Sequence, residues 1–296
     1  MKIVDLPTIA IIGPGKVGTS IGILASRAGY QIAAIGGRNK ERTIAAAKRI
    51  GNGVRACSIS EAAKKAPIVL LSVTDDAIED ICIRLAEQKK LKQKAVVVHC
   101  SGALSSNVLT SAHDYCKCSI ASMHPLQTFP TIDETVKRIK GAYCFCEGDE
   151  NAVSIIEQLA KSIGMKPVKI SSKSKTLYHA AAVMACNYLV VLMDSAIRLA
   201  ENAGIDRKTA WLSFKPLVTA TLDNINSMGT ADALTGPIAR GDIKTVSRHL
   251  HELSSVDGVL AAVYRTMGLY AAEMAATKGT ITTKKAEKIR TLLKKV

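Results

Sequence analysis

The stretch Gly13-Pro14-Gly15-Lys16-Val17-Gly18 decides the fold of this chain. It reads G-x-G-x-x-G, directly follows the apolar run 8–12, and leads into residues 17–28, whose apolar side chains recur at helical spacing. Strand, glycine turn and helix in this order predict a dinucleotide-binding site. The first glycine permits a tight turn, the second leaves space for a pyrophosphate, and the third allows close packing of helix on strand. The N-terminus of the helix then faces the phosphates, so all six residues are predicted to bind the cofactor.

The residues after the second predicted strand, 31–35, indicate which dinucleotide binds. NAD-binding enzymes carry an Asp or Glu at this strand end to bind the ribose hydroxyls. Here the chain reads Gly36-Gly37-Arg38-Asn39-Lys40-Glu41-Arg42, with no acid at the strand end. An arginine binds a 2′-phosphate with its planar fork, so Arg38 and Asn39 are predicted cofactor contacts and NADP is favoured over NAD. The alternative is that these basic residues only solvate the start of a helix.

Composition limits the classes of protein to which the chain can belong. Its 296 residues leave room for two domains, and 48% hydrophobic against 22% charged residues is typical of a globular protein. No uninterrupted apolar stretch reaches the roughly 18 residues of a membrane span. Eight cysteines beside an intracellular type of cofactor motif suggest reduced thiols. We therefore expect a cytoplasmic protein with no membrane partner.

The formal net charge of +15 raises the question of nucleic-acid binding. Basic clusters occur at residues 89–94, 173–175 and 284–295, but aromatic residues make up only 4% of the chain and none lies inside a cluster. Nucleic-acid binders interleave such clusters with aromatic side chains that stack on bases. We therefore expect a solvated surface, a small-molecule substrate and no nucleic-acid partner. Nucleic-acid binding is the alternative, and it predicts salt-sensitive association.

Strands and helices alternate through the first part of the chain, as a Rossmann α/β domain with a doubly wound sheet requires. Continuous apolar runs such as 67–73 and 95–99 predict parallel strands that are buried on both faces. After residues 171–175 only helical periodicity remains, and the predicted helices span 176–203, 206–228, 242–253, 256–278 and 283–295. The sequence therefore predicts a Rossmann domain over residues 1–171, followed by an all-α domain over residues 172–296.

Three polar stretches follow predicted strand ends, where ligands of open α/β sheets bind. The stretch Ser72-Val73-Thr74 is predicted to line the path of the cofactor. Ser101 is predicted to orient the reacting group of the substrate, with helix capping as the alternative. His124, before a proline, is predicted to transfer the proton because imidazole titrates near neutrality. A buried structural role is the alternative for His124, and the favoured interpretation for His99.

The helical half supplies further candidates for the site. His179 and Asn187 lie two turns apart on one face of the first long predicted helix, where they can reach a substrate. The alternative is that they are hydrogen-bond partners between helices. The later loop 234–242 contains Thr235 and Arg240, and Arg240 can hold a carboxylate or phosphate with two hydrogen bonds. Its alternative role is an ion pair with Asp242.

Two pairs of cysteines invite a metal hypothesis. Cys116-x-Cys118 and Cys144-x-Cys146 are each interpreted as a pair on one strand face, with His113 nearby. This spacing differs from that of structural zinc sites, and free cysteine is often a small buried hydrophobe. We therefore expect no metal.

The chain resembles a family of Rossmann-like oxidoreductases whose second half is a helical domain of unknown function. The resemblance rests on the glycine motif and on four further stretches, which are His99-Cys100-Ser101-Gly102, Met123-His124-Pro125-Leu126, Tyr178-His179-Ala180-Ala181-Ala182 and Thr235-Gly236-Pro237-Ile238-Ala239-Arg240-Gly241-Asp242. It implies an NADP-type cofactor and a helical domain like the C-terminal domain of 6-phosphogluconate dehydrogenase, which forms a homodimer and closes over the active site. More distantly, the chain is similar to pyrroline-5-carboxylate reductase, 3-hydroxyisobutyrate dehydrogenase and prephenate dehydrogenase.

These distant relatives differ in their catalytic groups. Ser101 and His124 match the serine after the fifth strand and the histidine before proline of prephenate dehydrogenases. Hydroxyisobutyrate dehydrogenases carry a lysine four residues before the asparagine that matches Asn187, and this chain has Val183 there. The resemblance therefore supports Ser101 and His124 as site residues and does not carry over the lysine mechanism.

The residues and the resemblance together predict an NADP-dependent oxidoreductase. It would transfer a hydride between NADPH and a carbonyl or imine group of a small polar, anionic substrate. His124 is predicted to transfer the proton and Ser101 to orient the reacting group, while His179, Asn187 and Arg240 bind the substrate. The alternative is a non-catalytic protein that binds NADP as a sensor or scaffold.

Overall fold

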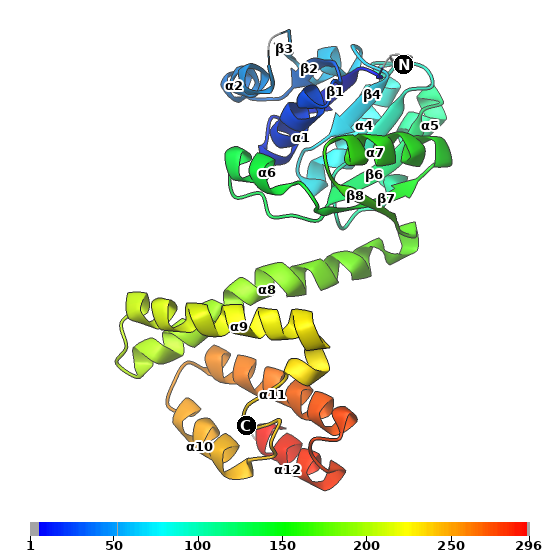
Figure 1. Ribbon diagram of the computed structural model, residues 1–296. Helices are drawn as coiled ribbons and strands as arrows, with labels where there is room; N and C mark the ends of the chain where they lie inside the picture. The colour runs from blue at the N-terminus through cyan, green and yellow to red at the C-terminus, as the bar shows by residue number, and fades with distance from the viewer. Residues whose placement is uncertain (1–5, 52, 295–296) are drawn as a thin grey trace. The chain divides into compact units, whose positions relative to one another are not determined.

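The computed structural model describes residues 6–51 and 53–294, and residue 295 of the last predicted helix lies outside them. Residues Met1–Val183 and Met184–Val296 form two compact units, called the first and the second unit below. The first unit carries the β-sheet, and the second is helical (Figure 1).

The sheet of the first unit has eight strands in the order β3-β2-β1-β4-β5-β6-β7-β8. All neighbouring strands are parallel except β6 and β7, which are antiparallel. The order of the first six is that of a Rossmann fold, which confirms the predicted fold class. The strands are β1 (Ile9–Ile12), β2 (Ile32–Gly36), β3 (Arg55–Cys57), β4 (Ile68–Leu71), β5 (Val96–His99), β6 (Ser119–Pro125), β7 (Tyr143–Gly148) and β8 (Lys166–Lys169).

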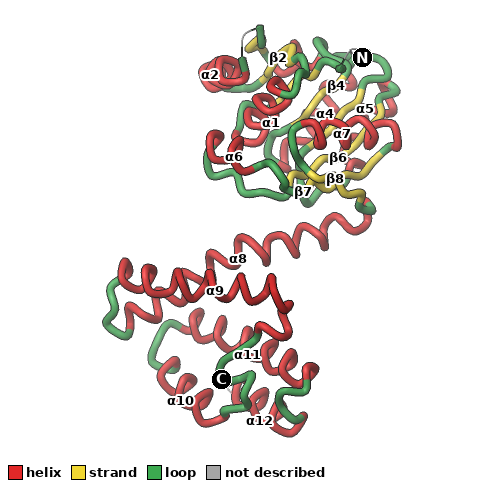
Figure 2. Tube along the Cα trace, viewed as in Figure 1, coloured by secondary structure: helices red, strands yellow, loops and turns green. Residues whose placement is uncertain are grey.

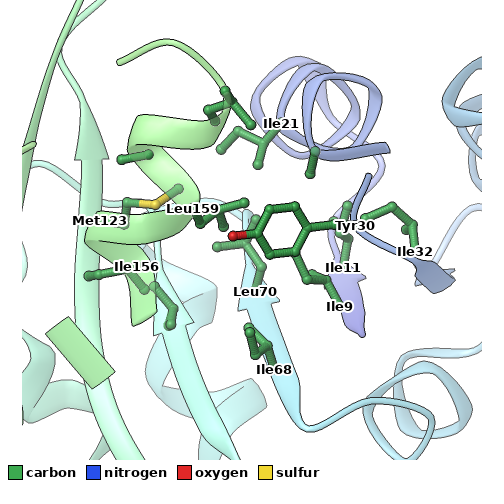
Figure 3. Packing of buried hydrophobic residues seen from close by; sticks show 14 of the residues in the cluster. Ile9, Ile11, Ile21, Tyr30, Ile32, Ile68, Leu70, Met123, Ile156 and Leu159 are labelled. Carbon is green, nitrogen blue, oxygen red and sulfur yellow. The ribbon is translucent and has the colours of Figure 1, made fainter. Parts of the chain in front are cut away.

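Helices cover both faces of this sheet, because alternate side chains of its buried strands point to opposite faces. Ile11 and Leu70 pack in one apolar core with α1, α2 and α7, as Figure 3 shows for part of this core. Ile12 and Leu71 pack in the other core with α3, α4 and α5. The helices are α1 (Lys16–Arg27), α2 (Lys40–Ile50), α3 (Ile59–Ala63), α4 (Asp75–Glu87), α5 (Thr110–Cys116), α6 (Ile132–Arg138) and α7 (Glu150–Ser162), with the 3-10 turns η1 (Ser106–Leu109) and η2 (Ser172–Ser174).

Several local features differ from the sequence predictions. Strand β7 reverses direction because the connection from β6 stays at the end of the sheet where β6 finishes. The short β3 and the polar α5 and α6 carry too little apolar periodicity to be predicted. The prediction that Cys116 and Cys118 share a strand face is wrong: Cys116 ends α5, and Lys117 has a left-handed φ of 54° before β6 begins. Cys144 and Cys146 do lie together on β7, with their Sγ atoms 3.9 Å apart.

All regular elements that follow β8 and η2 in the described residues are α-helices, and they make up the second unit (Figure 2). They are α8 (Lys175–Asn202), which begins in the first unit, α9 (Arg207–Ala233), α10 (Ile243–Leu253), α11 (Gly258–Lys278) and α12 (Thr283–Lys294). A small core joins the last three helices through Val246, Ala272 and Ile289. Helix α9 is kinked at Gly229, where φ is 79° and ψ is 170°. Long helices therefore lie on a core that is much smaller than the sheet cores.

A large apolar surface follows from this small core. Met184, Val190 and Leu217 are 62–67% exposed, and Val259 and Tyr270 are 66% and 65% exposed. By length and composition alone, Ser172–Asn202 is apolar enough to cross a membrane, with a mean hydropathy of 1.7, and only 6% of that window is buried. The first turn of the same helix places Lys175 inside the first unit, where it is 1% exposed.

Candidate functional site

The glycine turn between β1 and α1 is shaped by three glycines with different surroundings. Gly13 has a φ of +110°, and a Cβ there would lie 2.5 Å from the carbonyl oxygen of Ser72. A Cβ on Gly18 would lie 2.4 Å from the carbonyl oxygen of Gly13. A Cβ on Gly15 would meet nothing within 4 Å. Two glycines thus allow the chain to pack closely, and the middle one leaves open space above the backbone.

The N-terminus of α1 opens into that space. Gly15 is the N-cap, and no side chain caps the helix with a hydrogen bond. The first backbone N–H groups of a helix have no partner within the helix, and the helix dipole is positive at this end. The turn therefore offers backbone donors and positive potential to an anion such as a pyrophosphate.

A cleft of about 300 Å³ lies beside the glycine turn. It brings together most of the predicted cofactor contacts, namely Gly13, Pro14, Gly15, Arg38, Asn39, Ser72, Val73 and Thr74. Lys16, Val17 and Gly18 are not among its lining residues, while Arg42, one of the basic residues after β2, and Arg84, which the sequence analysis did not propose, are. Arg38 makes no hydrogen bond or ion pair with the described part of the chain, so its guanidinium is free for a ligand. The open turn, the uncapped amides and the arginines fit an anionic dinucleotide.

A side-chain hydrogen bond links the residues that follow β4 and β5. The Ser101 hydroxyl donates to Oδ2 of Asp75 over 2.8 Å, and Asp75 directly follows Thr74 of the cleft. The same Oγ accepts from the backbone N–H groups of Ala103 and Leu104 at 3.1 and 3.0 Å. A hydroxyl has one donor and two acceptor sites, so the Ser101 side chain is fully used. In this structure it fixes the turn after β5.

Gly102 is in the centre of that turn, and two histidine rings lie against it. A Cβ on Gly102 would be 2.5 Å from Nδ1 of His179 and 2.8 Å from both Cε1 and Nε2 of His124. The two ring centroids are 5.7 Å apart at an interplanar angle of 79°. His179 Nδ1 is buried and has no hydrogen-bond partner in the described chain. The structure thus brings His124 and His179 together beside Gly102. Nε2 of His124 and Nδ1 of His179 can each form a hydrogen bond with a ligand.

The other nitrogen of His124 is held by Tyr178, whose Oη lies 2.8 Å from Nδ1. The Tyr178 ring also packs on Phe145 of β7, with centroids 4.2 Å apart. Tyr178 was part of the family resemblance, but the sequence analysis gave it no role. The signal that could have found it is its place beside His179 at the start of α8.

Burial changes the protonation of these groups. The pKa of His124 is lowered to about 4, first by burial and then by the charges of Lys175 and His179. The pKa of His99 is lowered to about 3, again mainly by burial, and its ring is held by Ser105 and Ser101. Burial raises the pKa of Tyr178. His124, His99 and Tyr178 are therefore all uncharged near neutral pH, and His99 has the buried structural position that its sequence context favours.

Lys175 is the residue of this region that sequence reasoning missed most clearly. Its side chain is 1% exposed, its Nζ donates to the carbonyl oxygen of Ser101 at 2.8 Å, and it also contacts the Ser122 hydroxyl. The Glu147 carboxylate lies 3.9 Å from Nζ, and the Glu147 side chain is 2% exposed. The sequence places Lys175 in a basic cluster next to Lys173, which suggests a solvated surface and hides its burial.

The remaining predicted residues belong to the second unit. Asn187, Thr235 and Arg240 are exposed there. Asp242 caps α10 by accepting from the N–H of Thr245 at 3.0 Å, and this hydrogen bond, with the Arg240 charge as a smaller cause, lowers the pKa of Asp242. Their roles in substrate binding stay predictions. Within residues 6–51 and 53–294, no group of three or more His, Cys, Asp or Glu side chains is placed to hold a metal.

Two family models match the chain. A Rossmann-like domain matches residues 5–125, and a domain of unknown function, DUF2520, matches residues 142–271. The two matches lie in the order that the resemblance implied. A comparison with curated proteins finds no match.

Solved structures share the fold. Protein TM1727 from Thermotoga maritima is 27% identical, with a TM-score of 0.72 over 92% of this chain and 100% of its own. A proposed NADP oxidoreductase from Bacteroides fragilis is 20% identical, with a TM-score of 0.74 over 91% of this chain and 99% of its own. The Plasmodium falciparum pyrroline carboxylate reductase with NADP bound is 14% identical, with a TM-score of 0.55 over 97% of this chain and 98% of its own.

Proposed function

We propose that this chain, in which a Rossmann-like domain is joined to a DUF2520 domain, is an NADP-dependent oxidoreductase. Its substrate would be a small polar, anionic molecule with a carbonyl or imine group, or the corresponding alcohol or amine. When bound, the nicotinamide cofactor supplies or accepts a hydride. The rest of the chemistry, which is binding, orientation and movement of a proton, would fall to side chains of this chain.

The cofactor part of the proposal rests on the cleft beside the glycine turn. The uncapped amides of α1 and the open space at Gly15 suit a pyrophosphate. Arg38 and Arg42 line the cleft next to the end of β2, where no acid stands to repel a 2′-phosphate. This charge pattern supports NADP over NAD.

One observation carries the assignment to an enzyme. A continuous series of contacts runs from the cofactor cleft at Thr74, through the Asp75–Ser101 hydrogen bond, to Gly102 and the two histidine rings against it. A scaffold for NADP needs no such group of polar side chains beyond the cleft. A reductase needs them there, because they must bind the oxygen or nitrogen on which negative charge develops.

The proton would come from His124. Because Tyr178 is uncharged, its hydroxyl can donate to Nδ1 of His124, and the imidazole hydrogen is then on Nε2 beside Gly102. A neutral imidazole with this tautomer donates a hydrogen bond to a carbonyl oxygen or imine nitrogen and gives up its proton as charge develops. In the reverse direction Nε2 accepts the proton from the other neutral tautomer, in which Nδ1 carries the hydrogen and donates it to the Tyr178 oxygen. His124 would thus begin either direction as an uncharged imidazole.

Other groups would bind the substrate. His179 Nδ1 is buried without a partner next to the same turn, and a substrate donor or acceptor would satisfy it. From the second unit, Asn187, Thr235 and Arg240 would bind polar groups, with Arg240 on a carboxylate or phosphate. We further propose a homodimer through the helical half, because a partner subunit would cover the exposed apolar side chains of α8, α9 and α11. This arrangement uses neither a membrane nor a nucleic acid, and it suits the cytoplasm.

Binding and turnover together test the proposal. Calorimetric titration with NADPH and NADH comes first, followed by a steady-state screen of NADPH oxidation with 2-keto acids, imines and their cyclic precursors. We expect tighter binding of NADPH and turnover with at least one class. Tight NADPH binding without turnover on any class would favour the non-catalytic sensor or scaffold.

A further inference from the structure

The loop after β5 is held at both ends by one buried ion pair. At its start, Lys175 Nζ donates to the carbonyl oxygen of Ser101 at 2.8 Å. At its end, Glu147 accepts from the N–H and hydroxyl of Ser106 at 2.7 and 2.8 Å. The Lys175 and Glu147 side chains are 3.9 Å apart, and each is at most 2% exposed. Gly102 lies between the two held ends.

The same pair also holds the start of α8. Lys175 is the first residue of this helix, and Ser172 of η2 donates its hydroxyl hydrogen to Glu147. Tyr178 and His179 are on the next turn of the helix. The third contact of Lys175 is to the hydroxyl of Ser122, two residues before His124 on β6. All the elements that carry the histidine cluster therefore meet at one ammonium group.

A buried ion pair of this kind is seldom retained for stability alone. Removing two charges from water is costly, and a well-packed apolar pair is often at least as stable. The hydrogen bonds around Lys175 and Glu147 instead fix the geometry of the turn on which the rings of His124 and His179 lie.

We propose that Lys175 is a positioning residue of the active site, whose ammonium group, paired with Glu147, fixes the Ser101–Gly102 turn against the two histidine rings. That the turn serves a reaction rests on the proposed function. The test of Lys175 is independent of that function, because the position of the turn and the charge beside it are measurable without cofactor or substrate.

The charge of Lys175 supplies an independent readout. His124 is faced by Lys175, Tyr178 and His179 from α8 and by His99 from β5, and Lys175 is the nearby cation that most lowers the pKa of His124. Burial is the larger cause and stays when the lysine is replaced by an apolar side chain. Loss of the ammonium should therefore raise the pKa of His124 in part, whereas a purely packing role of Lys175 would leave it unchanged.

The experiment compares Lys175→Met with Lys173→Met in the full chain. Lys173 is exposed two residues earlier, so it is a matched control for the same change. Histidine ring signals, assigned with His124→Gln, are followed by NMR from pH 3 to pH 7, and circular dichroism checks folding. We expect the titration midpoint of His124 to rise by about one pH unit in Lys175→Met, the scale on which a nearby like charge acts, and to stay unchanged in Lys173→Met.

Amide hydrogen exchange of residues 101–104 tests the position of the turn. Faster exchange is expected in Lys175→Met, and also in Ser122→Ala, which deletes one contact of Nζ but keeps the charge. If Lys175→Met is folded and leaves both the His124 midpoint and the exchange rates unchanged, the proposal is overturned. If Lys175→Met does not fold, Ser122→Ala decides: unchanged exchange at residues 101–104 overturns the proposal, and faster exchange with an unchanged His124 midpoint supports it.

Discussion

The Tyr178 hydroxyl lies 2.8 Å from Nδ1 of His124, so that a residue of α8 determines which nitrogen of a strand-end histidine faces Gly102. The ring centroids are 5.6 Å apart at 76°. Both groups are uncharged near neutral pH, because burial lowers the pKa of His124 and raises that of Tyr178. A hydrogen bond between two neutral groups fixes the tautomer and the orientation of the imidazole.

Loss of this hydrogen bond should affect the reaction but not cofactor binding. Tyr178→Phe keeps the ring on Phe145 and removes only the hydroxyl. We expect turnover to fall by about 10-fold or more, because Nδ1 and Nε2 can then exchange the hydrogen, while NADPH affinity changes less than twofold. Steady-state kinetics and calorimetry measure the two effects, with Tyr143→Phe, an exposed tyrosine on β7, as the control. Equal turnover in both variants would contradict a tautomer role for Tyr178.

Gly102 should tolerate no side chain. A Cβ there would overlap His179 Nδ1 at 2.5 Å and His124 at 2.8 Å, so Gly102→Ala must displace at least one ring. We predict a loss of turnover of at least about 100-fold, the scale of a misplaced acid–base group. Gly258→Ala is the control, since a Cβ on Gly258 meets nothing within 4 Å. Normal turnover of Gly102→Ala would show that the two rings are not used together.

Arg38 should decide the choice of cofactor. Arg38→Ala removes one charge-assisted contact to a 2′-phosphate, which is worth about 1.5–3 kcal/mol, or roughly 10- to 150-fold in NADPH affinity. NADH lacks this phosphate, so its affinity should hardly change. The matched control is Arg27→Ala. Arg27 is exposed at the C-terminal end of α1, and the glycine turn is at the N-terminal end of this helix. Equal affinity of the wild type for NADPH and NADH would refute the preference.

Acid should destabilise the protein through its buried histidines. His99 binds a proton with a pKa of about 3 when folded and with a pKa near 6.5 when unfolded. The unfolded state therefore takes up more protons below pH 6.5, and the free energy of unfolding falls as pH falls toward 3. For His99 alone the loss at pH 5 is about 2 kcal/mol. Urea unfolding at pH 7.5 and pH 5 measures the loss in the free energy of unfolding between the two pH values. This loss should be larger in His251→Gln, an exposed control, than in His99→Gln.

The apolar surface of the second unit predicts its assembly. Sedimentation velocity at micromolar concentration should show a dimer, because side chains such as Leu217 and Val190 are 65% and 67% exposed in one chain. Leu217→Glu should weaken the dimer, and Lys288→Glu, a change at an exposed lysine of α12, should not. A monomeric wild type with NADPH present would contradict the proposed homodimer.

Much of the fold was predictable from local sequence patterns that span a few neighbouring residues. The glycine motif and the apolar runs of β4 and β5 identify buried strands, because a strand covered on both faces is continuously apolar. The antiparallel β7 was not predictable in this way, since its direction depends on where the chain returns to the sheet. The three residues of β3 were missed because Arg55 and Ala56 are exposed and show no apolar pattern.

The site was predictable only in part. His124, Ser101 and His179 could be proposed because predicted strand ends and the start of a long helix are places where ligands bind, and their roles stay predictions. Lys175 was not found, because a lysine in a polar stretch is normally exposed and its burial depends on Glu147, 28 positions earlier in the chain. The sequence also could not show that the Ser101 hydroxyl is already used by Asp75.

The central claim is that His124, beside Gly102, moves the proton of a reaction carried out with the cofactor of the adjacent cleft. The most direct measurement is turnover and NADPH affinity of His124→Ala beside His179→Ala, with the exposed His113→Ala as the control. Our account predicts that His124→Ala lowers turnover by ~10²–10⁴-fold, with nearly unchanged NADPH affinity. Near-normal turnover of His124→Ala, together with an inactive His179→Ala, would contradict it and assign the proton to His179.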